Sequence, residues 1–393
     1  MQEVVVTAGV RSAVGAFGKS LKPLSAVELG RQTLEGLMER ATISKEDVNE
    51  VIFGHGYVHG GGLNSARISS QLAGFPVSTP AHIVIKACGS SLKAVTAAAM
   101  TIATGQEEVV IAGGVESMSN VPYLVKNRWG GKFGHVKMED ALLSDGLICS
   151  LAEEHMGMTA ERLAEKYGIS REEQDAFAYN SHKKALQAIN TGKFNSEIIP
   201  LQYKAKGDEK VFQTDESVRQ NVSHEDLQKL QPVFKKGGTI TAGNACPMND
   251  GAAALLLMSR ERAENQGLKP LVKVKAFASA GVEPEVMGIG PVPAVQKALQ
   301  KAGLQLSDIG LVELNEAFAA QAISVIRELE LNEEIVNVNG GAIALGHPVG
   351  ATGAKLSVSL IHEMMRSKTK YGLVTACMAG GMGIAVIYEN MTF

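Results

Sequence analysis

The stretch HIVIKACGSSLKAVTAAAMTIATGQEEVVIAGG, residues 82–114, predicts the fold class of this chain. HIVIKA is an apolar, β-branched run typical of a buried strand, and EEVVIAGG is a second one. The segment between them is rich in Ala, Ser and Thr and is long enough for a buried helix. Strand, turn, helix and strand in this order predict a βαβ unit. Because helices filled with small residues can approach a sheet or one another closely, we expect a layered α/β body.

A faint internal repeat extends this pattern to the rest of the chain. The segment SKEDVNEVIFG, which starts at Ser44, resembles LSDIGLVELN, which contains Ser307. The strand VVIAGG (109–114) has a counterpart in LVTACM (373–378), in the same order along the chain. We therefore expect two similar halves, one supplying a nucleophile and the other its partners.

The composition changes between residues 115 and 243. This segment is more charged, contains the only Trp (Trp129), and has two amphipathic stretches within residues 159–192 that are separated by Gly168. Long insertions in compact enzymes commonly carry function. We predict an inserted loop domain over 115–243, an N-terminal half formed by 1–114 and 244–268, and a C-terminal half over 269–393.

The overall composition is that of a globular enzyme. The chain has 393 residues, of which 45% are hydrophobic and 20% charged, so two or three packed units are expected. A formal net charge of −3 argues against a nucleic-acid groove or a membrane surface as the main partner. Four cysteines without CxxC spacing favour free thiols in a reducing compartment, so we expect a cytoplasmic protein. The N-terminus is expected to be a first strand without a leader, and no apolar run is long enough for a membrane span.

Cys88 is the candidate nucleophile. It follows HIVIKA and opens the predicted helix, where backbone N–H groups and the positive end of the helix dipole would face its sulfur. We therefore expect a lowered thiol pKa and attack by the thiolate on an acyl group. The alternative, a buried cysteine that packs as a small hydrophobic residue, is disfavoured by its small neighbours Gly89, Ser90 and Ser91.

Three further residues complete an inventory for acyl transfer through a thioester. His347 lies in GHPVG, where Gly and Pro exclude a regular helix or strand, and it can take the thiol proton and later donate to an oxyanion. Asn315, in LNEAF, is either a helix N-cap or an anchor for a water molecule or a carbonyl oxygen. Cys377 ends the strand GLVTACM before the turn AGGMG, whose backbone N–H groups can hold an anion. A second nucleophile would be redundant, so Cys377 is expected to exchange a proton at a carbon next to a thioester.

Other motifs are weaker. His55 and His59 share the run GHGYVHGGG, but no Cys or carboxylate completes a zinc set there, and we expect a loop and no metal. The same run lacks the third glycine of a GxGxxG fingerprint, and the chain has no GxSxG motif.

Taken together, these motifs resemble the thiolase family over essentially the whole chain, and most closely its acetyl-CoA acetyltransferases. The resemblance rests on NSARISSQLAG, IAGGVESMS, ISREEQDAFA, GTITAGNACPMNDGAA, MGIGPVPA, LNEAFAAQ, VNVNGGAIALGHPVGATGA and CMAGGMG. It implies a five-layer αβαβα body of two similar halves with an inserted loop domain, assembled as a homodimer or homotetramer.

The resemblance also implies a role for each candidate residue. Cys88 would be acylated, His347 would activate it, and Cys377 would exchange the α proton. Asn315 and His347 would stabilise the first oxyanion through a held water molecule. The backbone N–H groups of Cys88 and Ala379 would stabilise the second oxyanion.

Coenzyme A would lie against the loop domain, with Arg219 near its adenosine phosphate end. The residues expected along the pantetheine channel are Leu147, His155, Met156, Phe234, Ala242, Cys246, Met287 and Phe318. His155 and Met156, in EEHMGMTAE, look like the short-chain members of the family. Acetoacetyl-CoA is therefore the expected substrate.

The implied reaction is the reversible condensation of two acetyl-CoA to acetoacetyl-CoA and CoA, in a ping-pong mechanism through an acetyl-cysteine. No cofactor is expected, because CoA is a substrate. The alternatives are a 3-ketoacyl-CoA thiolase of fatty-acid degradation that prefers longer chains, a ketoacyl synthase, and a thiolase-like protein that binds acyl-CoA without turnover.

Four positions depart from the family pattern. Ile85 and Ser91 stand three residues before and after the nucleophile, where Asn and Gly are usual. Ala379 replaces a Gly beside an oxyanion donor, and Cys246 replaces a Ser. None of these changes removes a reacting group.

Overall fold

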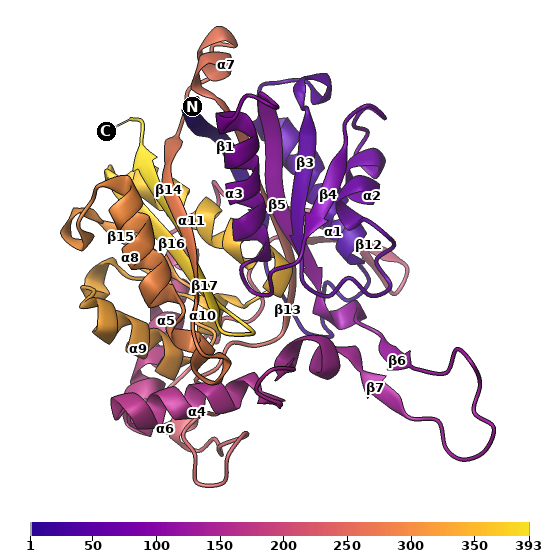
Figure 1. The fold of residues 1–393 in the computed structure, drawn as a ribbon, viewed down its shortest axis with the longest axis vertical. Helices are drawn as coiled ribbons and strands as arrows, with labels where there is room; N and C mark the ends of the chain where they lie inside the picture. The colour runs from indigo at the N-terminus through magenta and orange to yellow at the C-terminus, as the bar shows by residue number, and fades with distance from the viewer. Residues whose placement is uncertain (1, 393) are drawn as a thin grey trace.

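The computed structural model describes residues 2–392, and its elements alternate as the sequence predicts (Figure 1). The elements of the first half are β1 (Val4–Ser12), β2 (Gly15–Ala16), α1 (Ala26–Arg40), β3 (Glu50–His55), α2 (Ser65–Leu72), β4 (Ala81–Val84), α3 (Ser90–Ala103), β5 (Val109–Ser117), β13 (Asn249–Ser259) and α7 (Arg260–Asn265). The predicted unit is therefore present as β4, α3 and β5. The first strand is shorter than HIVIKA, because β4 ends at Val84.

The second half repeats the alternation. Its elements are β14 (Val272–Gly281), α8 (Pro291–Ala302), β15 (Leu311–Leu314), α9 (Ala319–Leu329), α10 (Ala342–Leu345), α11 (Thr352–Ser367), β16 (Tyr371–Met378) and β17 (Met382–Asn390). Between β5 and β13 the chain forms β6 (Tyr123–Val125), β7 (Met138–Asp140), β8 (Ile148–Cys149), β9 (Glu154–His155), α4 (Met156–Tyr167), α5 (Arg171–Asn190), β10 (Ile198–Ile199), β11 (Leu201–Ala205), β12 (Asp208–Phe212) and α6 (His224–Gln228).

The strands of both halves join in one mixed sheet of order β15-β16-β17-β14-β1-β13-β5-β3-β4, and β2 and β10 pair with its central strands. Within the first half, β3 runs parallel to both β4 and β5, as the βαβ pattern predicts. The halves meet where Val5 and Val6 of β1 pair with Lys273 and Val272 of β14.

Five layers follow from the faces that these elements bury. Helices α3 and α11 share one hydrophobic core with β5 and β13 of the first half and with β16 and β17 of the second. Helix α1 covers the opposite face of the first half, and α8 and α9 cover the opposite face of the second. Alternate residues of β5 divide between the cores, since Val109 and Ile111 face α1 whereas Val110 and Ala112 face α3. The predicted αβαβα body is confirmed.

The helices of the inserted segment pack under the second half (Figure 1). Gly168 ends α4 in the left-handed conformation (φ 59°), and the Ser170 hydroxyl accepts the Glu173 N–H at the start of α5, as the sequence indicates. A buried ion pair network fastens the segment to β1, because the Arg11 guanidinium contacts Glu197 at 2.6 Å and Asp215 at 2.8 Å.

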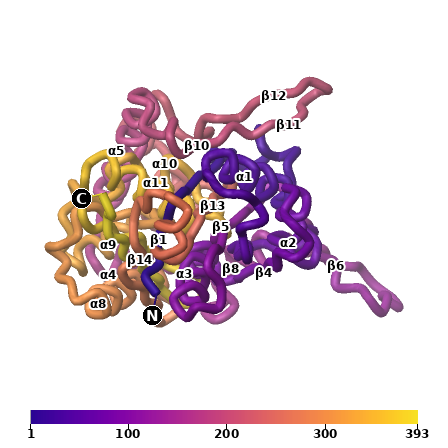
Figure 2. The backbone as a smooth tube through the Cα atoms, turned by 90° about the horizontal axis from the view of Figure 1, so that it is seen from above, coloured from indigo at the N-terminus to yellow at the C-terminus, as the bar shows by residue number. Residues whose placement is uncertain are grey.

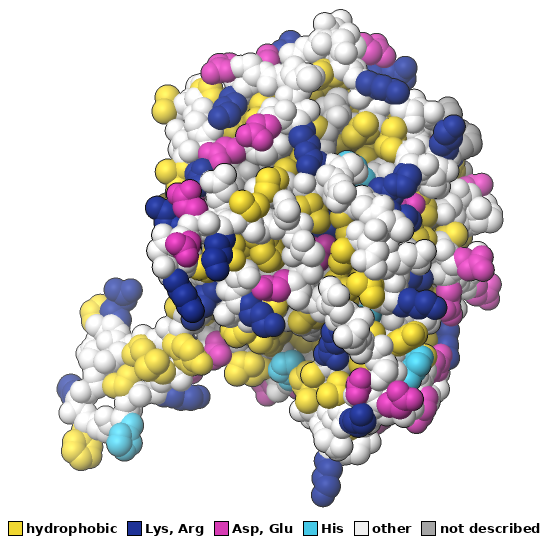
Figure 3. Space-filling view, turned by 180° about the vertical axis from the view of Figure 1, so that it is seen from behind, with side chains coloured by type: hydrophobic (Ala, Val, Ile, Leu, Met, Phe, Trp, Pro, Cys, Tyr) yellow, Lys and Arg dark blue, Asp and Glu magenta, His cyan; other side chains and the backbone are white. Residues whose placement is uncertain are grey.

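A hairpin formed by β6 and β7 projects from the body (Figures 2 and 3). Trp129 near its tip is 94% exposed, and Lys126, Arg128 and Lys132 lie beside it in the sequence. Among the helices within residues 2–392, none has the length and apolar character needed to cross a membrane.

Candidate active site

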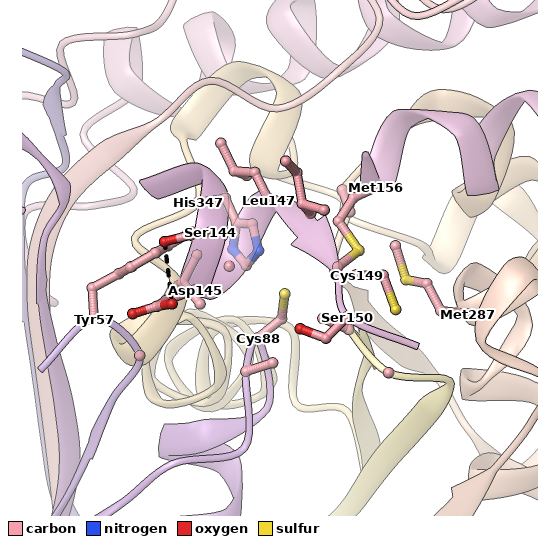
Figure 4. A pocket seen from close by; sticks show the side chains of 18 of the residues that line it. Tyr57, Cys88, Ser144, Asp145, Leu147, Cys149, Ser150, Met156, Met287 and His347 are labelled. Carbon is pink, nitrogen blue, oxygen red and sulfur yellow. Dashed lines mark hydrogen bonds between the residues drawn. The ribbon is translucent and has the colours of Figure 1, made fainter. Parts of the chain in front are cut away.

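A cavity of about 520 Å³ lies where the two halves and the inserted segment meet (Figure 4). It is lined by Cys88 from the first half, His347 from the second, and the backbone turn at Ala379 and Gly380. The apolar part of its wall includes Leu147, Ile148, Leu151, Met156, Met287 and Phe318. The structure therefore brings three of the predicted reacting positions to one hollow.

Cys88 stands on a sharp turn between β4 and α3. Ala87, just before it, has a left-handed backbone with φ 46°, a conformation that costs a non-glycine residue energy. The Ser90 side chain holds this turn, because its hydroxyl accepts the Lys86 N–H at 2.8 Å and donates to the Ala87 carbonyl at 2.7 Å. Helix α3 begins at Ser90, so Cys88 precedes the helix and does not open it as predicted. Its thiol points toward the imidazole of His347 (Figure 4).

Gly89 lets this turn sit close to the second half. A Cβ atom built on Gly89 would lie 3.0 Å from Ile384 Cγ2 and from Met378 Cγ, and still closer to the Met378 sulfur. The close approach of the turn to β16 and β17 therefore requires a residue without a side chain at position 89.

The predicted lowering of the Cys88 pKa is wrong. Burial raises the pKa of this thiol to about 11, although the backbone N–H groups of Ala379 and Cys88 act in the opposite direction. The negative charge of Glu116 raises it further. Desolvation outweighs the helix-terminus effect, because Cys88 lines a largely apolar cavity. The Cys88 thiol is therefore neutral at rest.

His347 is the candidate base for the Cys88 proton. Its Nδ1 lies 2.6 Å from the Thr352 hydroxyl, and that hydroxyl donates its only proton to the Pro348 carbonyl. Nδ1 must then carry the ring proton and donate to Thr352, which leaves the lone pair of Nε2 free to accept. Burial lowers the pKa of His347 to about 3, with a further lowering by Lys355, so the ring is neutral at rest.

Asn315 is positioned as an anchor. Helix α9 begins at Ala319 with Phe318 as its N-cap, so the N-cap alternative for Asn315 is wrong. The side-chain oxygen and nitrogen of Asn315 are buried and have no hydrogen-bond partner within residues 2–392, and the same holds for Nε2 of His347. Buried polar atoms are normally paired. These three atoms are therefore suited to bind a substrate oxygen or a water molecule.

Cys377 lies at the end of β16, fully buried, beside the turn that contains Ala379. It packs in one hydrophobic cluster with Met156 and Phe318, which line the cavity. Burial raises the pKa of the Cys377 thiol well above its ordinary value, and negative charge on Cys88 or Cys246 would raise it further. Cys377 is therefore a protonated thiol at rest, as a proton donor must be.

The pH dependence of alkylation tests the protonation state of Cys88. Because the pKa of this thiol is raised to about 11, its reaction with iodoacetamide in the free protein should keep rising between pH 7 and 10. An unperturbed thiol, with a pKa of about 8.5, would level off within this range. Peptide mass spectrometry would measure the rate at each cysteine. A plateau for Cys88 below pH 8 would show an ionised resting thiol and contradict this assignment.

The residues predicted to bind coenzyme A fall into two groups. Five of them line the cavity, namely Leu147, Met156, Cys246, Met287 and Phe318. The other four lie outside its lining. The His155 ring stacks on Phe234 with 4.4 Å between centroids, and Phe234 meets Phe318 edge to face at 6.2 Å. Exposed Arg219 donates from Nη2 to the Ala242 carbonyl at 3.3 Å.

The departures from the family pattern have structural settings. The Ser91 hydroxyl accepts the Ala354 N–H at 2.9 Å and so ties α3 to α11. Ile85 is 59% exposed. The cavity lining includes Ile85, Cys246 and Ala379. Burial raises the pKa of the Cys246 thiol to about 12, so this thiol is also neutral.

Sequence reasoning missed two residues at the site. Tyr57 lines the cavity, although its glycine-rich segment indicates only a loop. Glu116 is a buried carboxylate at the end of β5, where an acidic residue after the apolar run VVIAGG was the available signal.

The histidines of GHGYVHGGG have other partners. His55 Nδ1 lies 2.9 Å from the Ser65 hydroxyl, and His59 pairs with Asp145. Within the part of the chain that the structure describes, no three His, Cys, Asp or Glu side chains are grouped so that they could hold a metal ion.

The chain matches the thiolase N-terminal domain over residues 4–261 and the thiolase C-terminal domain over residues 268–390. It is 50% identical over 390 residues to an acetyl-CoA acetyltransferase of Chromobacterium violaceum, covering 99% of this chain and 100% of that relative. The crystal structure of the Bacillus anthracis acetyl-CoA acetyltransferase superposes with a TM-score of 0.98 at 44% identity, covering 100% of this chain and 99% of that one. Human mitochondrial 3-ketoacyl-CoA thiolase superposes with a TM-score of 0.97 at 41% identity, covering 99% of both chains.

Proposed function

Because the chain belongs to the thiolase family and is an acyltransferase, we propose that it is an acetyl-CoA C-acetyltransferase. It interconverts two acetyl-CoA with acetoacetyl-CoA and CoA through an acetyl group on Cys88. The observation that carries the proposal is the single cavity that holds Cys88, His347 and the Ala379 turn, with Cys377 buried beside it.

The first half-reaction of thiolysis breaks the carbon–carbon bond. His347 Nε2 takes the proton of the Cys88 thiol, and the sulfur attacks the 3-keto carbon of acetoacetyl-CoA. Asn315, with His347 and a held water molecule, stabilises the oxyanion. The bond between C2 and C3 then breaks, its electron pair goes to C2, and the Cys377 thiol protonates C2 to give acetyl-CoA.

The second half-reaction transfers the acetyl group to CoA. The Cys377 thiolate takes the proton of the incoming CoA thiol, and the CoA sulfur attacks the acetyl-Cys88 carbonyl. The backbone N–H groups of Cys88 and Ala379 stabilise the second oxyanion. Cys88 leaves and recovers its proton from His347, which restores both thiols. The cycle needs no cofactor.

The protonation states of Cys88 and His347 support the roles proposed for these residues. Neither a free thiolate nor an imidazolium is stable in the resting cavity, since burial raises the pKa of Cys88 and lowers that of His347. Proton transfer must therefore accompany attack, when developing charge moves onto a held oxygen atom. Each oxyanion donor contributes about 3 kcal/mol to such a step.

Thiolysis of a series of 3-ketoacyl-CoA substrates tests the proposal. We expect kcat/KM to be highest for acetoacetyl-CoA and to fall as the acyl chain lengthens, with ping-pong kinetics. A maximum at longer chains would assign the protein to fatty-acid degradation instead. Binding of acyl-CoA without any turnover by the unmutated protein would contradict an enzymatic role. A ketoacyl synthase would act only on a decarboxylating donor, and the buried thiol of Cys377 disfavours that reading.

We further propose that residues 115–243 act as the CoA-binding loop domain between halves formed by 1–114 with 244–268 and by 269–393. The contacts that place Met156 and Phe234 next to Phe318 support this division. Arg219, which is exposed and hydrogen-bonded to the Ala242 carbonyl, would contact the phosphates of the adenosine end. If a substitution that removes the charge of Arg219 left the KM for CoA unaltered, the proposed contact between Arg219 and CoA would be contradicted.

We propose a cytoplasmic homodimer or homotetramer that serves lipid metabolism. Strand β4 lies at the edge of the sheet, with exposed Leu72, Val77 and Ile85 in the segments on either side of it. The β6–β7 hairpin projects from the body (Figure 3). Its Trp129 side chain is exposed. Both surfaces are suited to pair with a second copy of the chain. Sedimentation of the full chain as a monomer would contradict this assembly.

A further inference from the structure

Glu116 is a buried carboxylate to which the reaction above gives no role. It ends the apolar run of β5, and its side chain has no exposure to solvent. Oε2 accepts the Gly350 N–H at 2.8 Å and the Gly56 N–H at 3.0 Å, and Oε1 accepts the Tyr57 N–H at 3.2 Å. Three backbone donors therefore converge on one side chain.

These donors come from both halves of the molecule. Gly56 and Tyr57 follow β3, whereas Gly350 belongs to the loop that carries His347. The loop sits tightly on the ends of β3 and β5, because a Cβ atom on Gly350 would lie 2.5 Å from the Val115 carbonyl oxygen and 2.6 Å from the Gly56 nitrogen. Glu116 thus links the His347 loop to the half that carries Cys88 through hydrogen bonds.

Other contacts hold His347 and its loop at different points. The Thr352 hydroxyl lies 2.6 Å from His347 Nδ1 and donates to the Pro348 carbonyl at 2.8 Å. The Asn249 side-chain oxygen accepts the His347 N–H at 2.9 Å, and Lys355 Nζ donates to the Gly346 carbonyl at 3.0 Å. Among these groups, only Glu116 contacts both the loop beyond His347 and a residue of the first half that lines the cavity. It accepts the Gly350 N–H of the loop and the N–H of Tyr57.

The charge of Glu116 does not activate the nucleophile. Its negative charge raises the pKa of Cys88 and so opposes formation of the thiolate. Burial also raises the pKa of Glu116 itself, to about 7, against the effect of its three N–H donors. His55, with Nε2 at 3.5 Å from Oε1, is neutral because burial lowers its pKa to about 4. The contribution of Glu116 must therefore come from its geometry as an acceptor.

We propose that Glu116 is a positioning residue for acyl transfer: its carboxylate locks the loop of residues 347–350 against β3 and β5, so that His347 meets the Cys88 thiol in a reactive geometry. The inference rests on the proposed function. An amide cannot replace the carboxylate, because glutamine offers one oxygen for three donors and would turn its own NH₂ group toward an N–H. A displacement of about 1 Å at a reacting group can cost about 100-fold in rate.

The test measures the single-turnover rate constant for acylation of Cys88 by acetyl-CoA. The release of CoA reports the reaction, and its amplitude is normalised to the fraction of sites that become acetylated. In Glu116→Gln we expect this rate constant to fall by about 10- to 100-fold, with the KM for acetyl-CoA changed by less than about 3-fold. Glu161→Gln is the matched control. Glu161 is equally buried and accepts the Thr239 and Ile240 N–H groups at 2.9 Å, but it does not contact the His347 loop.

Normalisation separates positioning from folding, since a purely structural role would lower the acetylated fraction and leave the rate per site intact. An unchanged rate constant in Glu116→Gln would overturn the inference, and so would an equal fall in Glu161→Gln. If Glu116→Gln does not fold, Glu116→Asp replaces it. Its carboxylate is one methylene too short to reach Gly350, so a normal rate would again overturn the inference. Absence of acetyl-Cys88 in the unmutated protein would instead refute the proposed function.

Discussion

Cys88→Ala is expected to abolish thiolysis of acetoacetyl-CoA, lowering kcat/KM by at least about four orders of magnitude. The other groups of the cavity can still bind the substrate and hold an oxyanion, but no atom remains to carry the acetyl group between the two carriers. Steady-state thiolysis measures the loss. Mass spectrometry after mixing with acetoacetyl-CoA should find an acetyl adduct on Cys88 of the unmutated protein and none on the variant.

Cys149→Ala is the control for this change, because it removes another thiol from the same cavity. The acetyl adduct on Cys88 should persist in it. Retained turnover in Cys88→Ala, or an adduct on a different cysteine, would refute the assignment of the nucleophile.

Cys377→Ala is expected to separate the two kinds of chemistry at the site. Thiolysis should fall by about 10²- to 10⁴-fold, the range of a lost general acid, because C2 of the leaving acetyl-CoA no longer receives its proton. Exchange of labelled CoA into acetyl-CoA should fall by less than about 10-fold. That exchange breaks no carbon–carbon bond, and its proton can pass between Cys88 and CoA through His347.

Deuterium incorporation gives the sharper readout. In D₂O the unmutated protein should exchange the methyl protons of acetyl-CoA, and Cys377→Ala should not. Cys149→Ala, which removes a buried thiol that lines the same cavity, should keep the deuterium incorporation. Persistent incorporation in Cys377→Ala would mean that another group moves the α proton.

Much of the architecture could be predicted from residues 82–114 and the internal repeat. The apolar runs and the Ala-rich segment predict β4, α3 and β5, and the repeat predicts a second half of the same kind. These features are local, since strand and helix periodicity depend on neighbours in the chain. The boundaries were less accurate, because Cys88 lies before α3 and β4 ends early. The family itself is confirmed by the match over residues 4–261 and 268–390.

The candidate site was only partly predictable. The residue types of Cys88, His347 and Cys377 indicate their chemistry wherever they lie. The structure brings Cys88 and His347 to one cavity and buries Cys377 in a hydrophobic cluster with Met156 and Phe318, which line that cavity. The position of Glu116 after an apolar run marks it as unusual but does not indicate its role, because its partners Gly56 and Gly350 are far apart in the sequence. Likewise, the N-cap alternative for Asn315 could be rejected only once the start of α9 was known.

The sequence by itself determined the layered α/β class, the two-half plan and the candidates for the reacting groups, because these follow from local patterns and side-chain chemistry. Only the tertiary structure decided the protonation states. Cys88 is a neutral thiol beside a neutral His347, in contrast to the thiolate that its position before a helix predicts. The physical reason is desolvation: the free energy of a charge depends on all the atoms that exclude water from it, and here those atoms come from both halves and the inserted segment.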